Sequence, residues 1–119
     1  MFEVYVKKHG RENVVPFVSI NPQGLFRFNI KSIQQYIHNK VFADVFIDHQ
    51  LRRIGFTFVD STCTKTTSMK LCKAGKSLIL QGQSILYELK YKISETKQFE
   101  LKEDGNIIYL QLVYDCMKH

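Results

Sequence analysis

Apolar and polar residues alternate with a period of two along much of the chain, and this pattern predicts short β-strands. The alternation is clear over residues 2–7, 25–28 and 53–59. Apolar side chains in such segments face a core while the polar ones face solvent. The breaks between them carry turn residues, and Asp104-Gly105 is the strongest hairpin signal in the chain. We therefore expect a protein rich in antiparallel β-structure.

Two segments have the helical spacing of apolar residues instead. The first follows Asn29, a favourable N-cap residue, and runs from about residue 30 to 39, with His38 on its solvent side. The second runs from about residue 84 to 92. The residues expected on the buried faces of these helices are Ile30, Ile33, Ile37, Ile85, Leu86 and Leu89.

The same order of elements occurs twice, which indicates an internal repeat. Each copy has an extended stretch, a glycine turn (Gly24 or Gly75), alternating apolar residues, a short helix and a closing hairpin. Residues 45–59 match residues 99–113 without a gap. Chance similarity of two ordinary ββαββ units is the alternative explanation. The boundaries predicted for repeat one, the polar linker and repeat two are residues 17–59, 60–68 and 69–113.

These patterns together predict one α+β domain over residues 1–119, because the length suits a single hydrophobic core. It should be mostly antiparallel β, with two ββαββ-like repeats and two short helices. The phenylalanines with core-facing parity are Phe26, Phe28, Phe56 and Phe58.

The balance of charges points to polyanionic partners. Seventeen lysines and arginines against eleven acids give a net charge of +6 and a pI near 9.3, which favours nucleic acid above other partners. The basic residues expected on outward strand faces and turns are Arg27, Arg52, Arg53, Lys70, Lys73 and Lys76. The alternative is that these side chains only solvate strands and protect sheet edges from aggregation.

Other kinds of site find little support in the sequence. Three cysteines without a C-x-x-C motif or a histidine at ligand spacing argue against a disulfide framework or a metal site. Cofactor and catalytic motifs are absent, and Asp48-His49 falls in a predicted turn where both residues are common. No apolar run is long enough to cross a bilayer, and residues 1–8 do not resemble a signal peptide. We therefore expect a cytoplasmic, non-enzymatic protein without cofactor or membrane association.

One family resemblance adds to this interpretation. The segment Val18-Ser-Ile-Asn-Pro-Gln-Gly-Leu-Phe-Arg-Phe-Asn-Ile-Lys-Ser-Ile-Gln-Gln-Tyr-Ile resembles the opening of AbrB/SpoVT/MraZ-type swapped-hairpin modules. Val45-Phe-Ile-Asp-His-Gln-Leu-Arg-Arg-Ile-Gly-Phe is similar to the closing hairpin of that family, and the second copy fits its tandem phage and bacterial forms. The resemblance implies binding of duplex DNA by a dimer or a tandem pseudo-dimer, as in a transcription regulator, in the host cytoplasm if phage-encoded. Two-repeat sheet proteins of the Whirly and coactivator type are a second comparison, which implies single-stranded DNA.

A protein-interaction module is the alternative function, for example a phage-encoded inhibitor or an assembly subunit. Such a module would pair an exposed strand edge or apolar face with a partner or with a second copy in a homodimer. One continuous positive face would favour DNA, whereas scattered charges around an exposed apolar patch would favour the interaction module.

Overall fold

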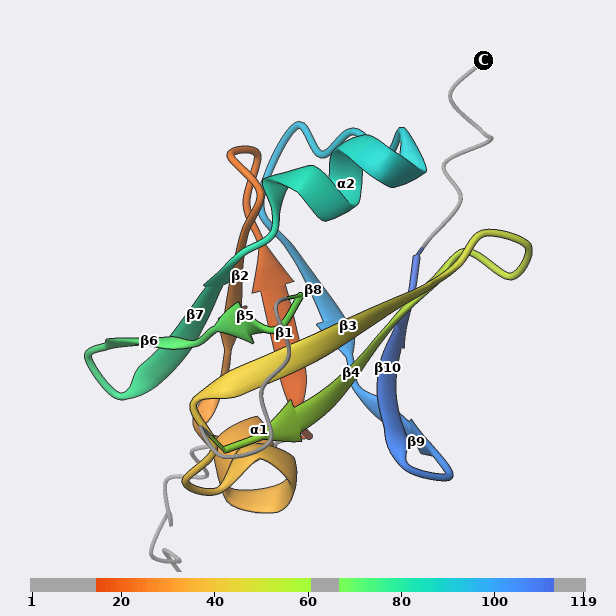
Figure 1. Cartoon of the computed structure of the whole chain (residues 1–119). Coiled ribbons are helices and arrows are strands. Elements are labelled where there is room, and N and C mark those ends of the chain that lie inside the picture. The colour runs from red at the N-terminus through yellow and green to blue at the C-terminus, as the bar shows by residue number, and fades with distance from the viewer. Residues whose placement is uncertain (1–14, 61–66, 113–119) are drawn as a thin grey trace, which may run out of the picture.

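We describe the fold from a computed structural model, which covers residues 15–60 and 67–112. The strand predicted at residues 2–7, most of the predicted linker and the C-terminal tail lie outside these ranges. Within them, ten strands form two five-stranded antiparallel sheets (Figure 1). The order in the first sheet, sheet A, is β6 (Cys72–Ala74), β7 (Ser77–Gln81), β2 (Leu25–Phe28), β1 (Phe17–Ile20) and β8 (Lys97–Glu100). The order in the second, sheet B, is β5 (Met69–Lys70), β3 (Phe42–Asp48), β4 (Arg53–Val59), β10 (Ile107–Gln111) and β9 (Lys102–Asp104).

Short helical segments lie at the two ends of the paired sheets (Figure 1). One end holds α1 (Ile30–Ser32), which continues directly into a π-helical turn, η1 (Ile33–Ile37). The other end holds α2 (Gln83–Leu89). The predicted class, α+β with mostly antiparallel strands and two short helices, is confirmed.

The start of the first helix was predicted correctly, but its course was not. The Asn29 side chain accepts a hydrogen bond from the Ser32 backbone N–H at 2.9 Å, as an N-cap residue should. The helix then widens into η1 and ends at Ile37 rather than residue 39, and Ile30 is 45% exposed rather than buried. The second helix buries Ile85, Leu86 and Leu89 as predicted. It ends at Leu89 because Lys90 adopts a left-handed backbone conformation.

Two buried leucines mark the points where the chain passes from one sheet to the other. Leu71 separates β5 in sheet B from β6 in sheet A, and its N–H donates to the Val41 carbonyl at 2.8 Å. Leu101 separates β8 in sheet A from β9 in sheet B, and its N–H donates to the Pro16 carbonyl at 2.9 Å. The first arm of the closing hairpin expected in the second copy is therefore two short strands, β8 and β9, that belong to different sheets. Alternation cannot reveal such a crossing, since the residue at the junction is apolar in either case.

Strands at matching positions of the two predicted repeats meet at the centre of each sheet. β2 pairs with β7 in sheet A, and β4 pairs with β10 in sheet B. In the latter pair Gly55 lies opposite Tyr109, a pair that the gapless alignment also matches. The hairpin loops differ in length, however, because residues 49–52 separate β3 from β4 and only residues 105–106 separate β9 from β10. The gapless alignment therefore matches β4 with β10 correctly, but on the other side of the turn it pairs residues of β3 and β9 that are two positions out of register.

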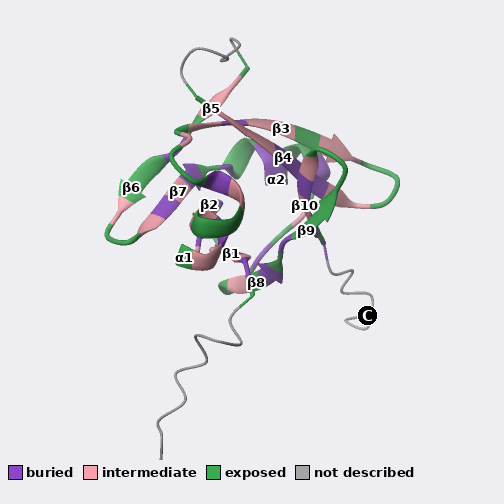
Figure 2. Cartoon of the chain, turned by 90° about the horizontal axis from the view of Figure 1, so that it is seen from below, coloured by how far each residue is buried: buried purple, intermediate pink, exposed green. Residues whose placement is uncertain are grey.

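The core lies between the two sheets and is built around aromatic rings. Phe26 and Phe28 from sheet A meet Phe56 from sheet B edge to face, with ring centroids 6.2 and 5.3 Å apart. These three side chains are fully buried, as predicted, and Phe58 packs partly buried against them. Buried segments face the interior of the sandwich, whereas β6 and β9 at the edges are largely exposed (Figure 2). In the described ranges, no helix is long and apolar enough to span a membrane.

Candidate nucleic-acid interface

A groove of about 510 Å³ lies between the β6–β7 hairpin and the segment that connects η1 to β3. Three lysines line it, Lys40 from the connecting segment and Lys73 and Lys76 from the hairpin. No carboxylate is among the described residues that line the groove. Its apolar lining comprises Ile33, Val41, Leu71 and Leu78.

Local backbone structure explains why these elements meet. Gly75 has the positive φ of +65° that the tight β6–β7 turn requires, and this turn carries Lys76. The hydrogen bond from Leu71 to Val41 ties the start of the hairpin to the connecting segment. Strand pairing and a single backbone anchor thus bring three lysine residues to the lining of one groove.

The connecting segment turns sharply at His38, which also lines the groove. His38 has φ 57° and ψ −118°, and the Lys40 N–H donates to the Ile37 carbonyl at 3.0 Å. These are the dihedrals of the first central residue of a type II′ turn, a position that strongly favours glycine. A residue with a side chain costs about 1–3 kcal/mol in such a conformation. The His38 side chain is exposed to solvent, although it lies next to the groove.

The structure brings together only some of the basic residues predicted for a binding surface. Lys73 and Lys76 line the groove together. Arg27 points to the other face of sheet A from Lys73. Arg27 and Cys72 both pair with Ile79, whereas Lys73 pairs with Leu78, and successive residues of a strand point to opposite faces. Lys70 is exposed at the edge of sheet B, where it pairs with Phe42.

The two adjacent arginines, by contrast, make contacts within the protein. The Arg52 guanidinium donates to the Leu89 carbonyl at 3.0 Å, which satisfies the C-terminal end of α2. The Arg53 guanidinium donates to Asp48 at 3.0 Å and lies 4.8 Å from the centroid of the Tyr109 ring. The hydrogen bond to Asp48 raises the pKa of Arg53 above its ordinary value. Both arginines therefore have structural partners before any ligand binds.

Sequence reasoning missed Lys40 and assigned His38 only to the solvent side of a helix. Both lie just beyond the last residue of η1, at the turn into β3. The run His38-Asn39-Lys40 was the available signal, since asparagine favours turns and the neighbours are basic. Its proximity to Lys73 and Lys76 could not be inferred, because it depends on contacts between segments far apart in the sequence.

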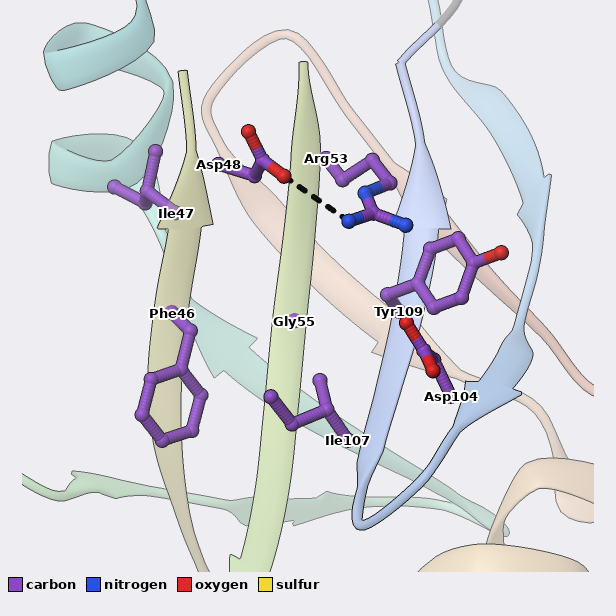
Figure 3. Close-up of a pocket in the computed structure, with 8 residues that line it drawn as sticks. All are labelled: Phe46, Ile47, Asp48, Arg53, Gly55, Asp104, Ile107 and Tyr109. Atoms are coloured by element: carbon purple, nitrogen blue, oxygen red, sulfur yellow. Dashed lines mark hydrogen bonds and ion pairs between the residues drawn. The ribbon is translucent and has the colours of Figure 1, made fainter. Parts of the chain in front are cut away.

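A second hollow, of about 140 Å³, lies on the outward face of sheet B around Gly55 (Figure 3). Phe46 and Tyr109 flank this glycine on the neighbouring strands, and Phe46 is 43% exposed. Ile107 covers one side so closely that a Cβ on residue 55 would come within 2.6 Å of its methyl carbon. The Asp48–Arg53 ion pair and Asp104 form a charged rim. This face is apolar at its centre and carries both signs of charge around it.

Asp48 at the end of β3 and His49 in the loop after it both make contacts within the protein. Asp48 accepts hydrogen bonds from the Leu51 N–H and from Arg53, and these lower the pKa of its carboxyl group. His49 lies 3.7 Å from Glu88, with both side chains largely exposed to solvent. Across the described residues, no three histidine, cysteine or acidic side chains come together in a group that could hold a metal ion.

Comparisons with protein-family models, curated proteins and solved structures give no match. The resemblance to swapped-hairpin modules therefore stays a prediction from sequence. The groove and the outward face of sheet B are the two candidate sites on which a function can be argued.

Proposed function

We propose that this chain is a small non-enzymatic protein that binds DNA through the groove lined by Lys40, Lys73 and Lys76. The observation that carries the proposal is the convergence of three lysines on one hollow, without a carboxylate among its described lining residues. Ammonium groups arranged in this way neutralise successive phosphates and release condensed counterions. The overall charge of +6 adds long-range attraction toward a polyanion.

Salt dependence is the quantitative signature of this mode of binding. Three phosphate contacts correspond to a slope of about −2 to −3 in a plot of log affinity against log salt concentration. Between about 50 mM and about 200 mM salt, affinity should therefore fall about 15- to 40-fold. Fluorescence anisotropy of labelled single-stranded and duplex DNA measures this slope directly. No binding at low salt would overturn the proposal.

A charge-matched pair of variants tests whether the groove is responsible. Lys40→Ala, Lys73→Ala and Lys76→Ala combined should abolish most of the salt-dependent binding, because all three phosphate contacts are lost. Lys92→Ala, Lys97→Ala and Lys102→Ala combined make the same change in net charge away from the groove, with Lys97 and Lys102 on the strands β8 and β9 at the far edges of the sheets. Equal loss of affinity in both variants would mean that net charge alone, rather than the groove, attracts DNA.

Self-association is a second candidate function, and the outward face of sheet B favours it. In a dimer with a two-fold axis, Phe46 of each copy would cover the hollow at Gly55 of the other copy. The rim carries Asp48, Arg53 and Asp104, so its charges are mixed and can pair across such an axis. Sedimentation velocity tests this candidate. A dimer that Phe46→Asp converts to a monomer would support it, and a monomeric unsubstituted chain at high concentration would exclude it.

A further inference from the structure

His38 occupies a backbone position that its side chain makes unfavourable. Its φ of 57° and ψ of −118° belong to the first central position of a type II′ turn, where glycine is strongly preferred. The turn closes a π-helical segment, and both π-helical turns and strained dihedrals occur frequently at functional sites. Such a strained residue calls for an explanation in either stability or function.

Stability does not explain the histidine within the described part of the chain. Its side chain is exposed and has no hydrogen bond or ion pair with the residues that the structure describes. A glycine would complete the same turn without the steric penalty of a Cβ. The imidazole ring therefore makes no polar contact with its described neighbours that would offset the strain of the backbone.

The surroundings of the ring indicate what it contacts instead. His38 borders the groove at the same side as Lys40, and the groove has an apolar lining that includes Val41, which is 41% exposed. The outside of a duplex offers phosphates, sugars and base edges, but the flat faces of its bases are stacked inside and cannot cover such a lining. An unpaired base does offer one, because its flat face can lie on aliphatic or aromatic side chains.

We propose that the groove accepts an unpaired nucleotide of single-stranded nucleic acid and that His38 stacks on its base. This inference rests on the proposed function of the same groove and specifies its ligand. Lys40, Lys73 and Lys76 hold the flanking phosphates, while the base lies between the imidazole ring and the apolar lining. Histidine is among the side chains on which unpaired bases commonly stack. The turn at residue 38 places the histidine among the residues that line the groove before the ligand arrives.

The diagnostic variant is His38→Gly, for which stability and binding should change in opposite directions. Removing the strain should raise the melting temperature by about 2–6 °C. Losing one stacked base should weaken binding of a labelled oligothymidine on the order of tenfold. The salt slope should stay unchanged, since the phosphate contacts remain. Binding of duplex DNA should change less than about twofold, because no unpaired base is present.

Two further variants separate this role from others. Lys90→Gly removes the side chain from another residue with positive φ, at the end of α2, and should weaken binding of the oligothymidine by less than about twofold, through the loss of one distant charge. His38→Tyr keeps an aromatic ring and should retain affinity within about twofold. A loss of affinity in His38→Tyr as large as in His38→Gly would overturn the stacking role.

The outcomes distinguish this inference from the proposed function. If the triple lysine variant loses binding while His38→Gly binds oligothymidine as well as the unsubstituted chain does, the stacking role is wrong and the phosphate-binding groove stands. If His38→Gly lowers the melting temperature, the histidine has a structural role and the inference is overturned. If the unsubstituted chain binds neither form of DNA, both proposals fail together.

Discussion

Asp48 and Arg53 show how single residues in a turn acquire partners that the sequence alone does not reveal. One Asp48 carboxylate oxygen accepts from the Leu51 N–H at 2.9 Å inside the hairpin loop, and the other accepts from Arg53 at 3.0 Å. The alternating pattern correctly predicted that Arg53 faces outward. It could not show that the guanidinium is already shared between Asp48 and the Tyr109 ring.

This arrangement predicts a dependence of stability on acid. The hydrogen bond from the Leu51 N–H has the largest effect on the Asp48 carboxyl group, and the hydrogen bond from Arg53 adds to it. Both lower the pKa of Asp48 in the folded protein below the ordinary value of about 3.9 for an aspartate. Its stabilising contribution is therefore present above about pH 4 and is lost as pH falls through the lower pKa of the folded state. Asp48→Asn should lower the melting temperature by about 1–3 °C at pH 7.

Thermal unfolding followed by circular dichroism between neutral and strongly acidic pH measures this effect. The difference from the unsubstituted chain should shrink below about pH 4, because the carboxyl group of the latter then also loses its charge. A difference of constant size across the whole range would contradict an electrostatic origin.

At the scale of elements, the two glycine turns occupy corresponding places in the two copies but differ in their surroundings. Gly24 has φ +84°, and a Cβ there would lie 2.5 Å from the Cα of Gln83 at the start of α2. Gly75 has φ +65° and no atom within 4 Å of such a Cβ. The sequence predicted both turns, but only the packing of α2 makes one of them intolerant of a side chain.

This contrast yields a matched pair of substitutions. Gly24→Ala should lower the free energy of unfolding by about 2–4 kcal/mol, since backbone strain and a clash with backbone atoms combine. Gly75→Ala should lower it by about 1 kcal/mol, through the unfavourable φ alone. Urea denaturation compares them, and equal losses would show that the contact with Gln83 does not constrain the turn.

At the scale of the whole molecule, the phenylalanine cluster joins the two sheets. Phe56 of sheet B contacts Phe26 and Phe28 of sheet A edge to face and stacks on Phe58 with centroids 5.9 Å apart. Phe46 lies in the neighbouring strand but points outward, to solvent. Phe56 and Phe46 thus place the same kind of side chain in the buried core and on the solvent-exposed face, respectively.

Phe56→Ala should lower the free energy of unfolding by about 3–5 kcal/mol, because it removes an aromatic ring from a filled core. Phe46→Ala should cost about 1 kcal/mol or less, since its ring is already partly in water. Chemical denaturation at low protein concentration measures both without interference from self-association. Comparable losses at the two positions would contradict the assignment of inward and outward faces.

Residue patterns over short stretches were enough to predict most of the local structure of this protein. Alternation, helical spacing and turn residues are encoded over a few neighbouring positions, so they correctly indicated the fold class, the cap at Asn29 and the buried phenylalanines. Each of these inferences depends only on which side of its own element a residue faces. The same patterns did not show that Lys73 shares a cross-strand row with the buried Leu78, on the opposite face of sheet A from Arg27.

Which of those elements meet depends on the packing of the whole fold. The passage of the chain between sheets at Leu71 and Leu101 depends on pairing between strands far apart in sequence. The same pairing brings Lys40 and His38 to the β6–β7 hairpin and leaves Arg27 on another face. The left-handed turn at His38 opposes local preference, so only contacts elsewhere in the fold can hold it. Local patterns cannot encode such contacts, because the free energy that selects them belongs to the packed sandwich as a whole.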